Sequence, residues 1–108
     1  MKKIEELAKK NNYETLLRQL TEEAGELIVA IQKYKRAQDE NLEVANIIKR
    51  YLDILREIAD VQICIEQLII SDDKDKIYIE NVKKDKILRQ LDRFKRRDEN
   101  NEWKSKNG

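Results

Sequence analysis

The chain has 108 residues, of which 42% are charged, with no proline, two glycines and one cysteine. This composition lacks the turn residues that an all-β protein needs about every 8–12 positions, so it favours a single all-α domain. One cysteine excludes an internal disulfide, and no apolar run approaches the roughly 18–20 residues of a membrane span, so we expect a cytoplasmic protein without a membrane partner.

The first two predicted helices lie before residue 38. A short helix is expected over residues 2–10, and Asn11 or Asn12 can cap the start of the next one. That longer helix is predicted from about Tyr13 to Ala37, with a connection at residues 38–41. Its apolar side chains recur three and four positions apart, as in a packed helix: Leu17, Leu20, Ala24, Leu27, Ile31 and Tyr34.

The second long helix is predicted to begin at Val44 and to end near Ile70. Ser71, Asp72 and Asp73 can then turn the chain and cap the helix that follows. The apolar stripe of this second long helix includes Ile47, Tyr51, Leu55, Ile58 and Ile65.

The last predicted helix carries its apolar residues between Ile77 and Phe94 and is strongly basic. Residues 83–108 hold 10 Lys and Arg against 5 Asp and Glu, whereas residues 1–82 hold 13 against 17. A basic helix can bind nucleic acid, a membrane surface or nucleotide phosphates, or it can be a solvated surface. We predict one helical domain over residues 1–97 and a polar, disordered tail over residues 98–108.

Two pairs of carboxylates stand out in the two long helices. Glu23 and Glu26 are three residues apart, as are Glu57 and Asp60, and residues at this spacing share one face of a helix. At 100° per residue, both pairs lie along a flank of an apolar stripe. If the two helices pack through these stripes, the four carboxylates can face one cleft.

Few local cations are placed to neutralise these carboxylates. Among the four, only Asp60 has a basic residue four positions away, which is Arg56. Acidic residues on helices are usually surface charges paired with Lys or Arg, and this alternative stays open. Gly25 lies beside the first pair, where a mid-helix glycine costs about 0.5–1 kcal/mol relative to alanine. It therefore indicates close approach of another helix or a ligand, unless it is merely tolerated.

The residue types limit which metal such a cleft can bind. The chain has no histidine, which disfavours a di-iron or di-manganese centre with Glu-x-x-His motifs and also disfavours zinc. Carboxylate oxygens favour Mg²⁺, with Mn²⁺ as a possible substitute, and protein-bound Mg²⁺ commonly shares its coordination with substrate phosphates.

The segments TEEAGEL at 21–27 and EIADV at 57–61 resemble the E-E-x-x-E and E-x-x-D signature of MazG-like all-α nucleoside triphosphate pyrophosphohydrolases. The resemblance extends over about residues 13–97. It implies long antiparallel helices in a half-bundle, a four-helix arrangement completed by oligomerisation as a homodimer or homotetramer. It also implies Mg²⁺-dependent hydrolysis of a (d)NTP to a (d)NMP and pyrophosphate, with a possible house-cleaning role.

The motif positions assign roles to individual residues. The resemblance implies that Glu23, Glu26, Glu57 and Asp60 bind Mg²⁺, with Glu22 and Glu23 as the catalytic residues. For the substrate phosphates we single out basic residues on the acidic flank and on the last helix: Lys33, Lys83, Lys86 and Arg89.

Two other functions remain open at this point. The basic segment 83–97 fits a helical nucleic-acid-binding or antitoxin-like module, although no recognition motif accompanies the charge. A bare oligomerisation bundle explains the apolar residues but leaves the four carboxylates and Gly25 without a role.

Overall fold

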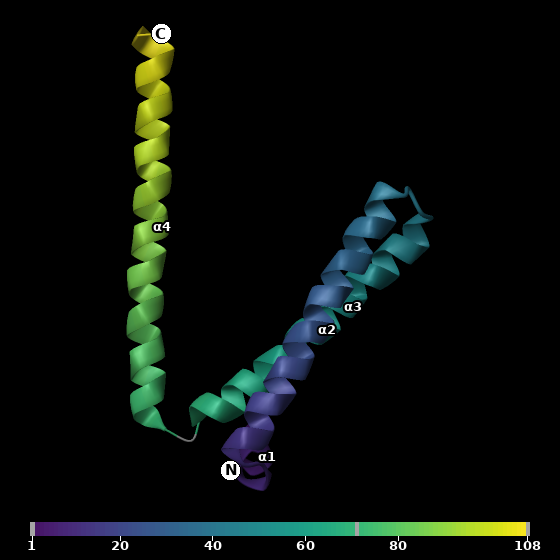
Figure 1. Cartoon of the computed structure of the whole chain (residues 1–108). Coiled ribbons are helices and arrows are strands. Elements are labelled where there is room, and N and C mark those ends of the chain that lie inside the picture. Colours follow the sequence, from purple (N-terminus) through teal and green to yellow (C-terminus); the bar gives the residue numbers. More distant parts are fainter. Residues whose placement is uncertain (1, 71, 108) are drawn as a thin grey trace. The chain divides into compact units, whose positions relative to one another are not determined.

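In the computed structural model, residues 2–70 and 72–107 are described, and they form helices without any strand, as predicted. Figure 1 shows the helices in chain order. Their bounds are α1 Lys3–Lys10, α2 Tyr13–Asp39, α3 Val44–Ile70 and α4 Asp73–Asn107. None of these described helices is long and apolar enough to cross a membrane.

Local hydrogen bonds fix both ends of α2. The side chain of Asn12 accepts a hydrogen bond of 2.8 Å from the backbone N–H of Thr15, which confirms the predicted N-cap. At the other end, the N–H of Leu42 donates to the carbonyl of Ala37, and Asn41 adopts a left-handed φ of 52°. These features form a Schellman motif, which ends the helix and reverses the chain toward α3.

Helices α2 and α3 lie side by side and run in opposite directions (Figure 1). Tyr34 near the end of α2 contacts Tyr51 near the start of α3, with ring centroids 5.8 Å apart. Asn11, directly after α1, contacts the C-terminal part of α3. Its side-chain amide donates a 2.8 Å hydrogen bond to the side-chain oxygen of Gln67. Gln67 is only 2% exposed, so this bond satisfies a buried polar group.

The side of α3 that packs on α2 is not its most apolar stripe. The contact row follows Ile54, Glu57, Val61 and Cys64, all buried or half-buried. By contrast, the predicted stripe is largely exposed, with Tyr51 47% and Leu55 44% accessible. The predicted stripe of α3 is therefore confirmed at Tyr51, which contacts α2, whereas Leu55, Ile58 and Ile65 lie about one position, or about 100°, away from the contact row.

The described residues divide into two compact units, one up to Asp72 and the other from Asp73 onward. The predicted single domain over residues 1–97 includes parts of both units, and it stays a prediction. Helix α4 continues to Asn107, past the point where we predicted a disordered tail to begin. The predicted turn residue Ser71 and the last tail residue, Gly108, lie outside the described part of the chain.

Helix α4 is polar on most of its surface. Ion pairs within the helix join Lys83 to Glu80 at 3.5 Å and Arg96 to Asp92 at 3.0 Å. The guanidinium of Arg97 lies 4.6 Å from the ring centre of Phe94, a cation–π distance. Contacts between near neighbours in sequence thus support this long helix.

Candidate metal centre

Carboxylates from two helices meet at one point of the α2–α3 pair. Glu23 comes from α2, and Glu57 and Asp60 come from α3. One oxygen from each of the three lies within 4.8 Å of the others. Because α2 and α3 are antiparallel, later residues of α2 face earlier residues of α3. This arrangement places the two predicted pairs opposite each other.

Two of these carboxylates have an oxygen that is shielded from water and lacks a protein partner. Oε2 of Glu23 and Oε2 of Glu57 are buried and accept no hydrogen bond from the residues that the structure describes. An unsatisfied buried acceptor is costly, and more so when it is charged. These two oxygens are therefore where a cation or a proton would stabilise the folded protein most.

This environment raises the pKa values of Glu23 and Glu57. Burial raises the pKa of Glu23 above its ordinary 4.5, and the charges of Glu26, Asp60 and Glu57 raise it further. Burial likewise raises the pKa of Glu57, followed by the charges of Glu26 and Asp60. Mutual repulsion of this kind is relieved when a divalent cation binds.

The donor set fits a hard divalent cation. At an Mg–O distance of about 2.0–2.1 Å, neighbouring oxygens around octahedral Mg²⁺ are about 2.9 Å apart and opposite ones about 4 Å apart. The three oxygens lie within 4.8 Å of one another, so side-chain movements of up to about 2 Å bring them to these distances. Glu23, Glu57 and Asp60 can therefore hold Mg²⁺ or Mn²⁺, with water or a ligand completing the coordination.

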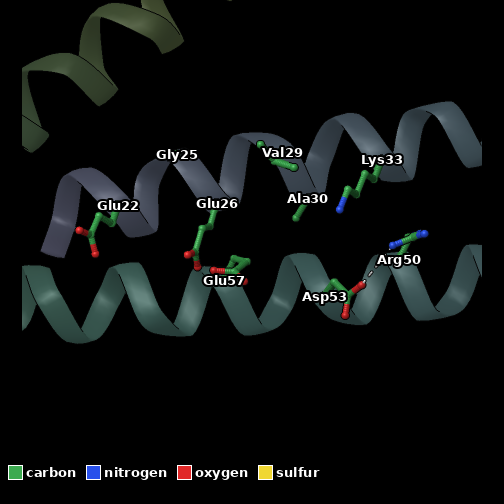
Figure 2. A pocket seen from close by; sticks show the side chains of 9 residues that line it. All are labelled: Glu22, Gly25, Glu26, Val29, Ala30, Lys33, Arg50, Asp53 and Glu57. Atoms are coloured by element: carbon green, nitrogen blue, oxygen red, sulfur yellow. Dashed lines mark ion pairs between the residues drawn. The ribbon is translucent and has the colours of Figure 1, made fainter.

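Glu26 lies beside this cluster and lines an adjoining groove. Its carboxylate points toward Glu57 in Figure 2, and its charge raises the pKa of both Glu23 and Glu57. It is not among the three residues whose oxygens meet most closely. Of the four predicted ligands, the structure thus brings three together and places the fourth next to them.

The groove is open, measures about 570 Å³ and lies between α2 and α3 (Figure 2). Three glutamates line one end of it, and two basic side chains line the other, where Asp53 is paired with Arg50. The charged residues on its walls are Glu22, Glu26 and Lys33 from α2 and Arg50, Asp53 and Glu57 from α3. The predicted catalytic residue Glu22 and the predicted substrate residue Lys33 therefore share one groove with Glu57, one of the three clustered carboxylates.

Gly25 also lines the groove, and the space around it shows whether helix packing requires a glycine there. A Cβ atom added there would meet no described atom within 4 Å. Helix packing inside the described chain therefore does not require a glycine at this position. Close approach of a ligand, or of a second copy, remains as a reason.

Arg50 is a groove residue that the sequence analysis missed. It lies 4.0 Å from Asp53 in an ion pair, and its side chain is 42% exposed. The signal was present, because Arg50 precedes Glu57 by seven residues and so lies on nearly the same face of α3. The apolar stripe drew attention to Tyr51, which lies about 100° away from Arg50 around the helix.

The other predicted substrate residues belong to α4. Lys83, Lys86 and Arg89 are exposed on that helix, and Lys83 forms an ion pair with Glu80. Since α4 belongs to the second unit, their role toward the groove stays a prediction.

Comparison with protein-family models, curated proteins and solved structures finds no match. The resemblance to the MazG-like enzymes therefore stays a prediction that rests on the two motifs.

Proposed function

We propose that the chain is a Mg²⁺-dependent nucleoside triphosphate pyrophosphohydrolase that converts a (d)NTP and water into a (d)NMP and pyrophosphate. The observation that carries the proposal is the meeting of Glu23, Glu57 and Asp60, of which Glu57 also lines the acidic end of a groove. Two of the carboxylates present buried oxygens without a described protein partner. The order and spacing of the two acidic motifs support the same activity.

In this proposal, Glu23, Glu57 and Asp60 hold the cation, and Glu26 adds negative charge beside them. Bound Mg²⁺ would supply charge neutralisation for the phosphate chain and a lower pKa for a coordinated water. Glu22 lines the groove but is not one of the clustered residues, so its carboxylate is available to accept the proton from water. Water adds to a phosphorus of the α–β anhydride, and the anhydride P–O bond breaks.

The groove suits a substrate with a long anionic chain. Acidic residues can bind such a chain only through a cation, while basic residues can bind it directly. Lys33 lies in the same groove as Glu22 and Glu26, and this neighbourhood favours a phosphate ligand over a bare cation store. The base and the sugar are left to be identified by experiment.

We also propose that a second copy covers the apolar face of the α2–α3 pair, as a half-bundle requires. Few side chains are buried within this unit, and the buried apolar ones are Leu16, Ala30, Ala37 and Cys64. Larger side chains such as Ile28 on α2 and Leu55 on α3 stay exposed. Ile28 follows the half-buried Leu27, and Leu55 follows Ile54 of the contact row. On antiparallel helices, equal steps past the facing residues place both on the same side of the pair. Two such faces can pair around a two-fold axis as a four-helix bundle.

A nucleotide panel tests the proposed activity. Pyrophosphate release is measured with each NTP and dNTP, with Mg²⁺ and with EDTA, for the parent and for Glu57→Gln. Glu66→Gln is the matched control, because Glu66 is exposed on the same helix and outside the groove. We expect Mg²⁺-dependent turnover of at least one nucleotide that Glu57→Gln abolishes and Glu66→Gln preserves. The proposal fails if the parent turns over no nucleotide or if Glu57→Gln matches it.

A further inference from the structure

The groove has a basic end that the acidic motifs do not account for. Lys33 from α2 and Arg50 from α3 both line it (Figure 2). The two side chains come from different helices, yet they occur in one groove with Glu26 and Glu57. The position of this basic end follows from the antiparallel packing.

Lys33 follows Glu26 by seven residues, and Arg50 precedes Glu57 by seven residues. Because α2 and α3 run in opposite directions, both steps lead toward the same end of the helix pair. Seven residues of α-helix rise about 10 Å, or two turns. The groove therefore has carboxylates at one end and two cations about two turns away.

Local ion pairs leave positive charge available at the basic end. Lys33 makes no ion pair with any residue that the structure describes. Asp53 is the nearby acid, but it is shared between Arg50 at 4.0 Å and Arg56 at 3.8 Å. One carboxylate thus faces two guanidinium groups, and the positive charge of Lys33 is additional. Exposed pairs at such distances contribute little to stability, so structure alone gives Lys33 and Arg50 little reason to converge.

We propose that Lys33 and Arg50 together bind the phosphates of the substrate that lie farthest from the metal centre. This inference rests on the proposed function and adds Arg50 to it as a substrate-binding residue. A guanidinium can donate two parallel hydrogen bonds to a phosphate, and the ammonium of Lys33 adds a compact second charge. A ligand that spans both ends must carry several phosphates in a row. A single phosphate can reach one end only, so the pair selects chains over orthophosphate.

Calorimetric titration of the full chain tests the proposal with three probes: Mn²⁺ alone, inorganic triphosphate with Mg²⁺, and orthophosphate with Mg²⁺. The test variants are Lys33→Gln, Arg50→Gln and the charge-preserving Arg50→Lys. The matched controls are Lys35→Gln and Lys49→Gln, which remove the same charge at exposed neighbouring positions outside the groove.

We expect Lys33→Gln and Arg50→Gln each to weaken triphosphate binding by about tenfold or more, as the loss of a charged hydrogen bond predicts. The same variants should bind Mn²⁺ like the parent, which also shows that they are folded, and the parent should bind triphosphate more tightly than orthophosphate. Arg50→Lys should keep part of the affinity, and the two control variants should keep all of it.

Two failures are distinguishable. If the parent releases pyrophosphate from a nucleotide while Arg50→Gln binds triphosphate like the parent, this inference is overturned and the proposed function stands. If the parent turns over no nucleotide, the proposed function is overturned, and the inference that rests on it falls as well. Equal losses in Lys49→Gln and Arg50→Gln would also overturn the inference, because they would indicate a general effect of charge.

Discussion

At the scale of single residues, the acidic cluster could be predicted because neighbours on a helix are known from sequence. The spacing of Glu23, Glu57 and Asp60, and the lack of basic residues one turn away from Glu23 and Glu57, do not depend on tertiary structure. Their convergence to within 4.8 Å does depend on it. The shielding of one oxygen on Glu23 and on Glu57 could not be predicted, because it arises from the packing of α2 on α3.

The raised pKa values of Glu23 and Glu57 predict how stability depends on pH. Above pH 4.5 the folded protein holds more protons at these two sites than the unfolded chain does. Their contribution to the free energy of unfolding therefore falls as pH rises from 4.5 through the raised pKa values. Urea unfolding in EDTA, over a pH series, should show Glu57→Gln gaining stability relative to the parent across this interval.

Mg²⁺ should reverse this trend, since it binds the deprotonated carboxylates of the folded state. The stabilisation of the parent by excess Mg²⁺ should grow with pH over the same interval. A difference between the parent and Glu57→Gln that stays constant with pH, in EDTA and in Mg²⁺ alike, would contradict this account.

At the scale of the helices, the predicted starts and ends of α1, α2 and α3 are close to those observed, whereas α4 continues beyond its predicted end. The N-cap residue Asn12 was recognisable, because its side chain competes well for an unpaired backbone N–H. The face of α3 that contacts α2 was not recognisable. Hydrophobic periodicity ranks faces by their apolar content, and it cannot tell whether a face packs on a neighbouring helix of the same chain or elsewhere. Arg50 was missed for this reason.

Removal of the N-cap side chain of α2 should lower the free energy of unfolding. Asn12→Ala deletes the side chain that accepts the 2.8 Å hydrogen bond from Thr15, and such changes typically cost about 1 kcal/mol. Urea unfolding checks the value. Asn12→Ser, which keeps a capping oxygen, should lose much less, and equal losses for both variants would contradict the cap.

Gly25→Ala separates the two possible roles of this glycine. An added methyl group meets open space, so the helix should gain about 0.5–1 kcal/mol in stability. The methyl group also enters the groove, so we expect KM for the nucleotide to rise. Unfolding and steady-state kinetics measure the two effects. A stabilised variant with unchanged kinetics would show that no ligand approaches this position.

At the scale of the whole molecule, the all-α class followed from composition, but the arrangement beyond the α2–α3 pair did not. Nothing in the periodicity of residues 98–107 distinguished a polar tail from the helix that is observed there. The uncovered apolar face of the α2–α3 pair likewise becomes visible only when the contact row on α3 is known.

Association of two copies through this face gives a further prediction. Leu55→Glu places a charge on the exposed apolar side of α3 and should shift the protein from dimer, or larger assembly, to monomer. Sedimentation velocity measures the change. Asn46→Glu is the matched control, because it adds the same charge at an exposed position nine residues before Leu55, about 180° away around the helix. A parent that is monomeric, or equal dissociation by both variants, would contradict the proposed half-bundle.

The central claim is that carboxylates of α2 and α3 form one divalent-cation site, and a Mn²⁺ titration followed by electron paramagnetic resonance tests it most directly. The parent should show saturable binding that Mg²⁺ displaces. Glu23→Gln and Glu57→Gln should each weaken this binding by about tenfold or more, whereas Glu66→Gln should leave it unchanged. A parent without saturable Mn²⁺ binding, or full binding in both cluster variants, would contradict the account.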